Sequence, residues 1–427
     1  MNLAIKDNLQ YYILLLTPFL LIPGILLVEI SALILILFFL LKNKDLKYYK
    51  DFKFLFLILF SIYVAINALF QISSNLKFSS FFFFRFSLLS LSIFYILDST
   101  KFNSNDAKKY ILFFLVFLNI LIFLDSYLQF LTGKNVFGFQ IIGSTVSSIF
   151  GSELVLGSFL IKLLSIIIFL FFYSDVDVKK HSFVIILFFG FYFSIIYIAG
   201  GRTPFFLMLL FILCSIIFIE DLRGIFLRSL LIFIIFASLL FVFKFGKTNP
   251  VDRVFIKTFS QITNNYFNKK TDNTSEEKKE LNKEIKIFSS EHHGHYVLAY
   301  DLFKRNPIWG IGPKGFRNYC RSVDYDPPVG ICSTHPHNFL VQIATETGLI
   351  GLIFYLSGLV FIFLRLLKAY LGKDLGERNC FLVISIGLIV NFFPLVPNGN
   401  FFNNWISIIN FYYIGFYMYS YKNMFSK

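Results

Sequence analysis

The chain has 427 residues, of which 57% are hydrophobic and 15% are charged, and its mean hydropathy is +0.71. This balance excludes a soluble globular domain, which carries far more charge at this length. The net charge of +14 suggests nucleic acid at first sight, but Lys and Arg also accumulate on the cytoplasmic side of membrane proteins. We prefer the second explanation and expect no nucleic-acid partner.

Apolar runs near the length that crosses a bilayer recur along the chain. We predict an all-α integral membrane fold of about twelve transmembrane helices, because lipid offers backbone polar groups no partner outside a helix. The predicted segments are 11–22, 25–41, 54–72, 81–97, 110–131, 153–173, 182–198, 204–219, 229–245, 348–367, 380–396 and 405–421.

The first two segments are the least distinct. Residues 11–41 form either one tilted helix or two short helices broken at Pro23 and Gly24, since proline ends or kinks a helix and glycine permits the turn. No small-residue cleavage site follows this run, so we expect the first helix to act as the insertion signal.

The distribution of Lys and Arg assigns the two sides of the membrane. Eighteen lie in one set of loops and ends, namely Lys6, 42–53, 98–109, 174–181, 220–228, 368–379 and the tail after 421. The opposite short loops hold three, which are Lys77, Lys134 and Arg202. The first set is therefore predicted to be cytoplasmic, together with both termini. An even number of helices follows, which favours two segments within 11–41.

Three regions result. Residues 1–245 hold helices one to nine, residues 348–427 hold the last three, and residues 246–347 form one large loop on the outer side. Within the loop, 247–290 is rich in Lys and Glu and is predicted to be an exposed helix with a flexible linker. The following stretch, up to residue 347, is dense in His, Gly, Pro, Trp and Cys, which indicates a compact segment packed on the helices.

Two cysteines, Cys320 and Cys332, lie twelve residues apart in this loop. We favour a disulfide between them over two free thiols, because the outer compartment is oxidising. The Cys and His spacing does not form the two close ligand pairs of a zinc site, so no metal is predicted.

Charged residues in or beside the apolar segments need a reason. Arg85 interrupts the run FFFFRFS, where it either reaches the interface or points into a cavity and holds a lipid phosphate. Asp125 and Glu29 are predicted to pair helices. Arg202 lies in the tight turn AGGRTPF; it either anchors the turn at the interface or offers its planar fork to phosphate oxygens.

A helix is predicted to begin near Pro336, with Ser333 or Thr334 as its cap. Gly348 and Gly351 then open the next transmembrane helix, where small residues allow close helix packing.

His337 falls at the start of this helix, at the mouth of the bundle. A single histidine is usually structural, but one placed here among several cations is a candidate general base. Asn338, Gln342 and Glu346 recur at helical spacing and share one face.

Several motifs together resemble the O-antigen ligases and the related O-antigen polymerases. The run His337-Asn338, then nine residues, then Gly348-Leu-Ile-Gly351 is similar to their signature. GGRTPF resembles their arginine turn, and RNPIWGIGPKGF resembles the Pro…Gly-x-Gly step before the histidine. Two further segments resemble their outer loops, QFLTGKNVFGFQIIGSTVSSIFGS and NFFPLVPNGNFFNNW. The resemblance runs from about residue 120 to the end of the chain.

The resemblance implies an inverting glycosyl transfer without metal or other cofactor, on the periplasmic face of the bacterial inner membrane. The donor would be a glycan on undecaprenyl pyrophosphate. The acceptor would be a lipid A-core sugar hydroxyl in a ligase, or a second lipid-linked repeat unit in a polymerase. Asp324 and Asp326 have the spacing of a metal-binding acidic pair, but we interpret VDYDPP as a turn.

Matched by position, His337 corresponds to the histidine proposed to activate the acceptor, and Arg202 to one of two arginines that hold the donor pyrophosphate. The second arginine should lie about fifteen residues before Pro307, where this chain has His292. Either His292 or His295 replaces it, or another cation does. The other donor-binding candidates are Arg253, Arg85, Lys314 and Arg317, and the supporting residues are Asn338, Glu346 and His335.

Ligase is the leading hypothesis and polymerase the close alternative. A transporter of lipid-linked oligosaccharide would also explain many helices, but transporters usually have internal repeats and none is evident here. A passive assembly partner for other envelope proteins is the remaining possibility.

Overall fold

The computed structural model describes residues 2–71, 80–99, 105–174, 176–178, 180–256, 259–260, 290–319, 333–372 and 377–425. In this part of the chain every regular element is a helix. Two isolated bridges, Lys134 with Gln140 and Ile142 with Thr145, lie in the loop after α6. The first half of the chain contributes α1 (Asn2–Leu16), η1 (Phe19–Leu21), α2 (Ile25–Lys42), α3 (Phe52–Gln71), α5 (Phe84–Asp98), α6 (Asn105–Thr132), η3 (Ser148–Phe150), α7 (Leu156–Tyr173) and α8 (Ser182–Ile198). The second half contributes α9 (Arg202–Phe218), α10 (Glu220–Phe243), η4 (Asp252–Ile256), α12 (Ser290–Arg305), α13 (Phe316–Tyr319), α14 (Phe339–Leu371), α15 (Arg378–Asn391) and α16 (Asn404–Phe425).

Each predicted apolar segment overlaps one of these helices, although the first, 11–22, extends past the end of α1 at Leu16 and includes η1. Six of them are long and apolar enough to cross a bilayer, namely α2, α3, α6, α7, α10 and α14, and α8, α9 and α15 are apolar but shorter. The chain is therefore a helical, multi-pass membrane protein, and the number of twelve crossings stays a prediction.

The first apolar region, residues 11–41, is broken before α2, as Pro23 and Gly24 predicted. Gly24 has φ +143°, a conformation that side-chain-bearing residues rarely adopt, and α2 begins directly after it. Helix α10 starts at Glu220, earlier than the predicted 229. Glu220 and Asp221 occupy its first turn, where acidic side chains favour a helix N-terminus.

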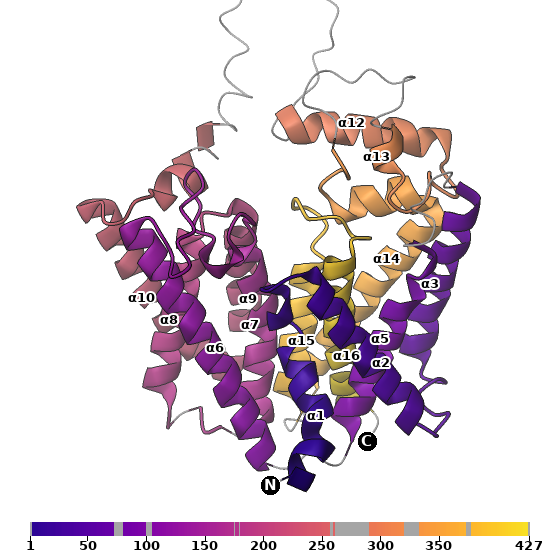
Figure 1. Cartoon of the computed structure of the whole chain (residues 1–427), viewed down its shortest axis with the longest axis horizontal. Helices are drawn as coiled ribbons and strands as arrows, with labels where there is room; N and C mark the ends of the chain where they lie inside the picture. The colour runs from indigo at the N-terminus through magenta and orange to yellow at the C-terminus, as the bar shows by residue number, and fades with distance from the viewer. Residues whose placement is uncertain are drawn as a thin grey trace, which may run out of the picture.

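The helices form two groups (Figure 1). One group holds α6 to α10, and the other holds α2, α3, α5, α14 and α16. Helix α15 joins them, since it packs against α7 and α9 as well as α14 and α16. Close contact between α16 and α5 depends on Gly415, because a Cβ there would lie 2.6 Å from the Cβ of Ile93. The core between the elements is dominated by aromatic and branched aliphatic side chains.

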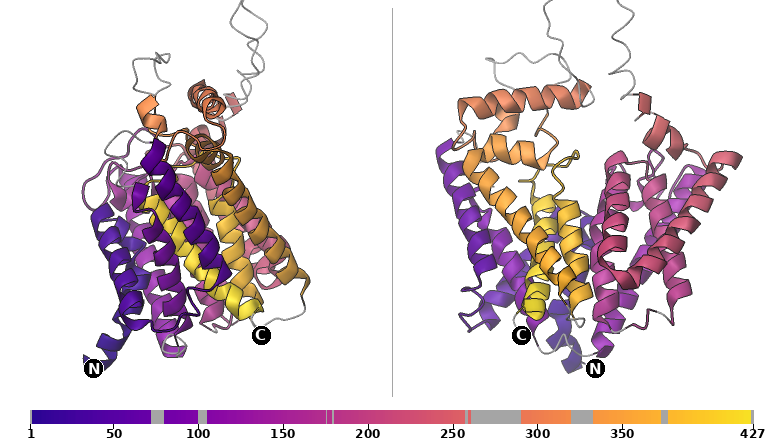
Figure 2. Two further views of the ribbon diagram at one scale, coloured as in Figure 1. Left: turned by 90° about the vertical axis from the view of Figure 1, so that its right-hand side faces the viewer. Right: turned by 180° about the vertical axis from the view of Figure 1, so that it is seen from behind.

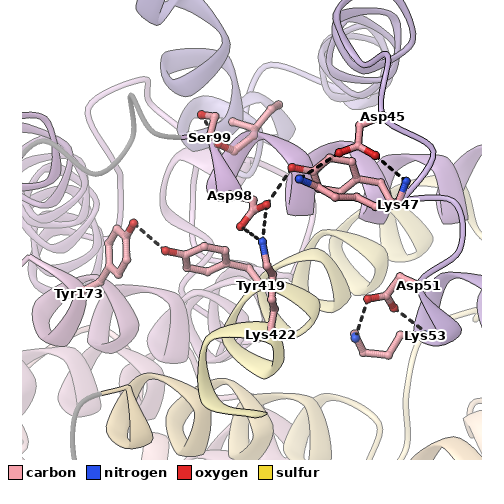
Figure 3. Close-up of polar contacts among 11 residues, drawn as sticks. Asp45, Lys47, Asp51, Lys53, Asp98, Ser99, Tyr173, Tyr419 and Lys422 are labelled. Carbon is pink, nitrogen blue, oxygen red and sulfur yellow. Dashed lines mark hydrogen bonds and ion pairs between the residues drawn. The ribbon is translucent and has the colours of Figure 1, made fainter. Parts of the chain in front are cut away.

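Helices α12 and α13 lie across one end of the bundle, and both termini lie at the other (Figures 1 and 2). The end with the termini is held by Asp98 of α5, whose carboxylate pairs with Lys422 of α16 at 2.6 Å and accepts the Tyr48 hydroxyl at 2.8 Å (Figure 3). Both termini thus share one end of the bundle, opposite α12. Which end faces the cytoplasm stays a prediction.

Candidate active site

Helix α14 is broken near its start by Gly348, which has φ +61° and ψ −164°. A break leaves backbone carbonyls of the preceding turn without their helical partners. Two of them are satisfied from another segment: Thr345 accepts the N–H of Ile311 at 3.0 Å, and Glu346 accepts the N–H of Gly312 at 2.9 Å. The segment RNPIWGIGPKGF therefore docks into the break.

Gly348 is required by this docking. A Cβ on it would lie 2.2 Å from the Ile308 carbonyl oxygen, and its backbone is left-handed. The next residue, Leu349, donates its N–H to the Pro307 carbonyl at 2.8 Å. The sequence-based expectation that Gly348 serves helix-to-helix packing is wrong, because the close contact is with the backbone of a loop.

Helix α3 closes the other side of the break. The Tyr63 hydroxyl donates to the Thr347 carbonyl at 2.6 Å, and the Asn67 amide donates to the Trp309 carbonyl at 2.5 Å. The rings of Tyr63 and Trp309 stack with centroids 6.1 Å apart. No sequence signal pointed to these two α3 residues.

Glu346 organises the loop that precedes α13. Its carboxylate accepts the N–H groups of Lys314 at 3.0 Å and Phe316 at 3.2 Å, and the Gln342 amide at 2.9 Å. The same Gln342 amide donates to the Asn400 side chain at 2.8 Å. The Glu346 side chain is fully buried, so its place is to support the loops.

Asn338 caps α14. Its side-chain oxygen accepts the N–H of Val341 at 3.0 Å, and its amide donates to the Pro394 carbonyl at 2.8 Å. The predicted caps, Ser333 and Thr334, are wrong. Asn338 takes the position because its amide also reaches the loop between α15 and α16.

His337 lies immediately before this cap with φ +56°. Its Nε2 is 2.9 Å from the Ser333 hydroxyl, and its carbonyl accepts the N–H of Asn398 at 2.7 Å. The ring is half-buried and has two histidine neighbours, with centroids 4.1 Å away in His335 and 5.4 Å away in His295. The left-handed backbone is uncommon for such a residue, and strain of this kind gathers at functional sites.

His335 is held in one neutral form. Its Nε2 is 3.3 Å from the Asn398 carbonyl, which only accepts, so Nε2 carries the proton. Its Nδ1 then accepts from the Thr334 hydroxyl at 3.0 Å. Burial, followed by the neighbouring His337, lowers the pKa of His335 to about 3. His335 therefore stays neutral near pH 7, and its ring lies against that of His337.

Arg202 and Arg253 lie together at the same end of the molecule. Arg202 begins α9, and its Nε donates to the Arg253 carbonyl at 3.2 Å. Arg253 comes from η4, and its guanidinium donates to the Thr145 hydroxyl. Burial and the charge of Arg202 both lower the pKa of Arg253. Gly200, with φ +71°, leaves room for this arrangement, since a Cβ there would lie 3.3 Å from the Arg253 side chain.

The loop between α6 and α7 positions Thr145. Asp125 of α6 accepts the N–H of Val136 at 2.9 Å and the hydroxyl of Ser148 at 2.5 Å. Gln129, one turn later, accepts the N–H of Ser148 at 2.6 Å. The prediction that Asp125 pairs two helices is wrong, because its partners belong to this loop.

The loop between α15 and α16 connects the arginine pair to the histidine. Phe393 of this loop packs against Phe206, one turn after Arg202, with ring centroids 6.0 Å apart. Asn398 of the same loop contacts His337. In Figure 1 the loop lies between the upper ends of α9 and α14.

The other predicted cations gather elsewhere. Lys314 is 8% exposed, and burial, with help from Arg317 and Arg85, lowers its pKa to about 8. The Arg85 guanidinium donates to the Phe82 carbonyl at 3.0 Å and lies 4.4 Å from the Phe86 ring centroid. The structure thus brings Lys314, Arg317 and Arg85 into one group, which also includes the carboxylates of Glu346 and Glu29, and Arg202 with Arg253 into another.

Glu29, predicted to pair helices, joins α2 to α16 by accepting the Asn404 amide at 2.5 Å. The side chain of His292 lies outside the described residues, as do Cys320 and Cys332, the predicted disulfide. The acidic spacing at 324 and 326 lies outside them too.

Sequence reasoning also overlooked Lys162, a charged residue in the middle of α7. It lines a small internal cavity with Thr17, Tyr412 and Tyr413. The signal was available, since a single lysine interrupts the apolar run. Within the described part of the chain, no group of three or more His, Cys, Asp or Glu side chains is arranged to hold a metal ion.

Comparison with protein families gives one match: residues 183–356 match the family model described as O-antigen ligase. The matched range includes Arg202, Arg253 and His337, together with the segment that docks into α14. A search of curated proteins found no match to the chain.

Proposed function

We propose that the chain is a ligase-type glycosyltransferase, because residues 183–356 match the family model described as O-antigen ligase. It moves a glycan from undecaprenyl pyrophosphate to a lipid A-core sugar hydroxyl, on the periplasmic side of the bacterial inner membrane. The observation that carries this proposal is the single loop that contacts both His337 and the helix of Arg202.

Arg202 and Arg253 hold the donor pyrophosphate. Two adjacent guanidiniums repel each other until an anion binds between them, and each offers a planar fork to phosphate oxygens. Negative charge develops on the leaving pyrophosphate during transfer, so fixed cations there stabilise the transition state. In this proposal Arg253, oriented by Thr145, fills the place of the second family arginine in preference to His292.

His337 receives the proton of the acceptor hydroxyl. The acceptor oxygen forms a bond to the anomeric carbon while the bond from that carbon to the pyrophosphate oxygen breaks. The proton passes to the His337 ring, which is the residue type best suited to this exchange near neutral pH. His335, held neutral at 4.1 Å between ring centroids, does not compete for the proton and keeps the His337 ring in place.

Chain extension is the second candidate function, and one observation favours it. Lys314 lies within range of the charges of Arg317 and Arg85, with Glu346 and Glu29 nearby, and the charge of Arg317 also reaches His335. An acceptor that carries its own pyrophosphate, which is a lipid-linked repeat unit, would use such a group. This acceptor would make the protein an O-antigen polymerase.

The test is glycan transfer by the purified protein in detergent, with and without a chelator. The donor is undecaprenyl-pyrophosphate glycan, and the acceptor is either lipid A-core or a second donor molecule. His337→Ala is compared with His181→Ala, an exposed histidine at the opposite end of the bundle, at equal thermal stability.

Transfer to lipid A-core that persists in chelator and is lost only in His337→Ala supports the ligase. Chain growth on the second donor supports the polymerase. If wild type transfers to neither acceptor while both lipids bind, the transporter becomes the better explanation.

A further inference from the structure

An apolar groove of about 390 Å³ lies between α3, α14 and α16, away from the histidines. It runs from Phe401 near the α12 end to Lys53 near the end with the termini. On α3 its lining spans Phe52 to Phe60, a rise of about 12 Å at 1.5 Å per residue. Ser357 in its wall is exposed, and Gly358 is half-buried. The groove therefore opens on the outer surface of the bundle. The two helices that line its opening, α3 and α14, run side by side (Figures 1 and 2).

Lys53 closes the groove at the end with the termini. Its side chain is 8% exposed, and its ammonium is 2.8 Å from the carboxylate of Asp51 (Figure 3). The same ammonium lies 4.3 Å from the ring centroid of Tyr421 on α16. Asp51 compensates this buried charge, and the ion pair lies at the end of the apolar groove.

Two further cations stand beside this mouth on α14. The half-buried Arg365 lies over the rings of Phe361 and Tyr421, with its guanidinium carbon 5.3 Å and 5.5 Å from their centroids. Lys368, one turn on, is exposed and lies 5.7 Å from the Phe425 ring centroid. Phe361 also lines the groove. With Lys53, the mouth carries three cations and one carboxylate, so it is net positive.

An apolar groove with a net positive mouth is complementary to an anionic amphiphile, such as an anionic phospholipid. Basic pockets between transmembrane helices bind anionic lipid head groups, and the guanidinium fork matches phosphate geometry. A zwitterionic lipid would bring its own cation to the mouth. We infer that this groove binds one anionic phospholipid, with an acyl chain along α3 and α14 and its phosphate at Arg365, Lys368 and Lys53.

A lipid in this groove would stabilise the packing of α3 against α14. Helices α3 and α14 both line the groove, and the same two helices meet at the break near Gly348 through Tyr63. A bound lipid fills the space below that contact and stabilises the pair. It thereby supports the segment that carries the start of α14.

The experiment measures phospholipid binding to the purified full chain in detergent, by native mass spectrometry and by thermal unfolding. Phosphatidylglycerol is compared with phosphatidylethanolamine. Arg365→Gln removes a mouth cation, and Gly358→Phe fills the groove. Arg228→Gln, an exposed arginine of α10, and Val360→Phe, an exposed position of α14 outside the groove, are the matched controls.

We expect phosphatidylglycerol to bind wild type and both controls and to raise their melting temperature. Its affinity should fall about tenfold in Arg365→Gln, as for loss of one charge-assisted contact, and similarly in Gly358→Phe. The melting temperature of each variant is first measured without lipid. If a test variant does not fold, Lys368→Gln, a substitution at an exposed position, is used in its place.

Equal binding of phosphatidylethanolamine overturns the inference, as does unchanged phosphatidylglycerol binding in both test variants. Preferential binding of a polyprenyl phosphate at the groove overturns it too. Glycan transfer is not part of the readout, so the result is independent of the proposed enzyme activity.

Discussion

The Nε of Arg202 lies 3.2 Å from the carbonyl oxygen of Arg253, which brings two guanidiniums from α9 and η4 to one place. They are 51 residues apart in the chain. Like charges are held together here by a backbone hydrogen bond and by the Thr145 hydroxyl. The arrangement stores repulsion that a bound pyrophosphate would relieve.

Arg253→Ala should lower kcat/KM for glycan transfer by about 10² to 10³, as for loss of one donor at a developing negative charge. Arg253→Lys should recover little, because an ammonium lacks the planar fork. Steady-state kinetics on purified variants measure both. Arg305→Ala, an exposed arginine at the end of α12, is the control, and an equal loss in both alanine variants would contradict the role of Arg253.

Gly348→Ala should destabilise the protein by at least about 2 kcal/mol, the scale of left-handed backbone strain with a steric clash. The added Cβ would meet the Ile308 carbonyl oxygen and force the docked segment out of the break. Gly224→Ala in α10, whose Cβ would meet nothing within 4 Å, should be neutral or slightly stabilising. Melting temperatures in detergent compare the two, and similar values for both would refute the account of the break.

The free energy of unfolding should decrease at acidic pH because of His335. Its pKa is about 3 in the folded chain and 6.5 in a model peptide, so only the unfolded chain takes up this proton between those values. Stability from this group is present above pH 6.5 and falls as the pH drops toward 3. The decrease in melting temperature from pH 7 to pH 5 should be smaller in His335→Asn than in His181→Asn. A decrease of the same size in both would show that His335 is not held neutral.

Anion binding at Lys314 should weaken in alkali. Its pKa is lowered to about 8, so the ammonium is charged below that pH and is lost above it. In wild type, the KM for a phosphorylated acceptor should rise from pH 7 to pH 9. Lys314→Arg, which keeps its charge in this range, should flatten the rise, whereas Lys304→Arg at an exposed position should leave it unchanged. A rise that persists in Lys314→Arg would remove this residue from the binding site.

The helices were largely predictable, because apolar runs between polar loops are a strong signal. The segment predicted at 182–198 has the bounds of α8 (Ser182–Ile198). The contacts that build the candidate site could not be predicted, because they join residues that are far apart in the sequence. Arg253 finds Thr145 across 108 positions, and nothing local in either segment indicates the other.

Predictions of helix caps and of glycine roles from local sequence were wrong where a distant segment contacts the same residues. Ser333 and Thr334 are good caps by composition, but Asn338 caps α14 because loop carbonyls draw its amide. Gly348 was predicted to allow two helices to pack closely. Instead, its positive φ and its missing side chain make room for the segment around Ile308. His337 was predicted to lie in the first turn of a helix that begins near Pro336, but α14 begins at Phe339, so His337 precedes the cap. Its carbonyl is held by Asn398, about 60 residues later in the chain.

The roles of His337 and Arg202 are separated by measuring donor binding and glycan transfer side by side on His337→Ala and Arg202→Ala. We expect His337→Ala to bind undecaprenyl-pyrophosphate glycan like wild type but to transfer it about 10² to 10⁴ times more slowly, as for loss of a general base. Arg202→Ala should lose donor affinity. Wild-type transfer rates in His337→Ala, or unchanged donor affinity in Arg202→Ala, would contradict these roles.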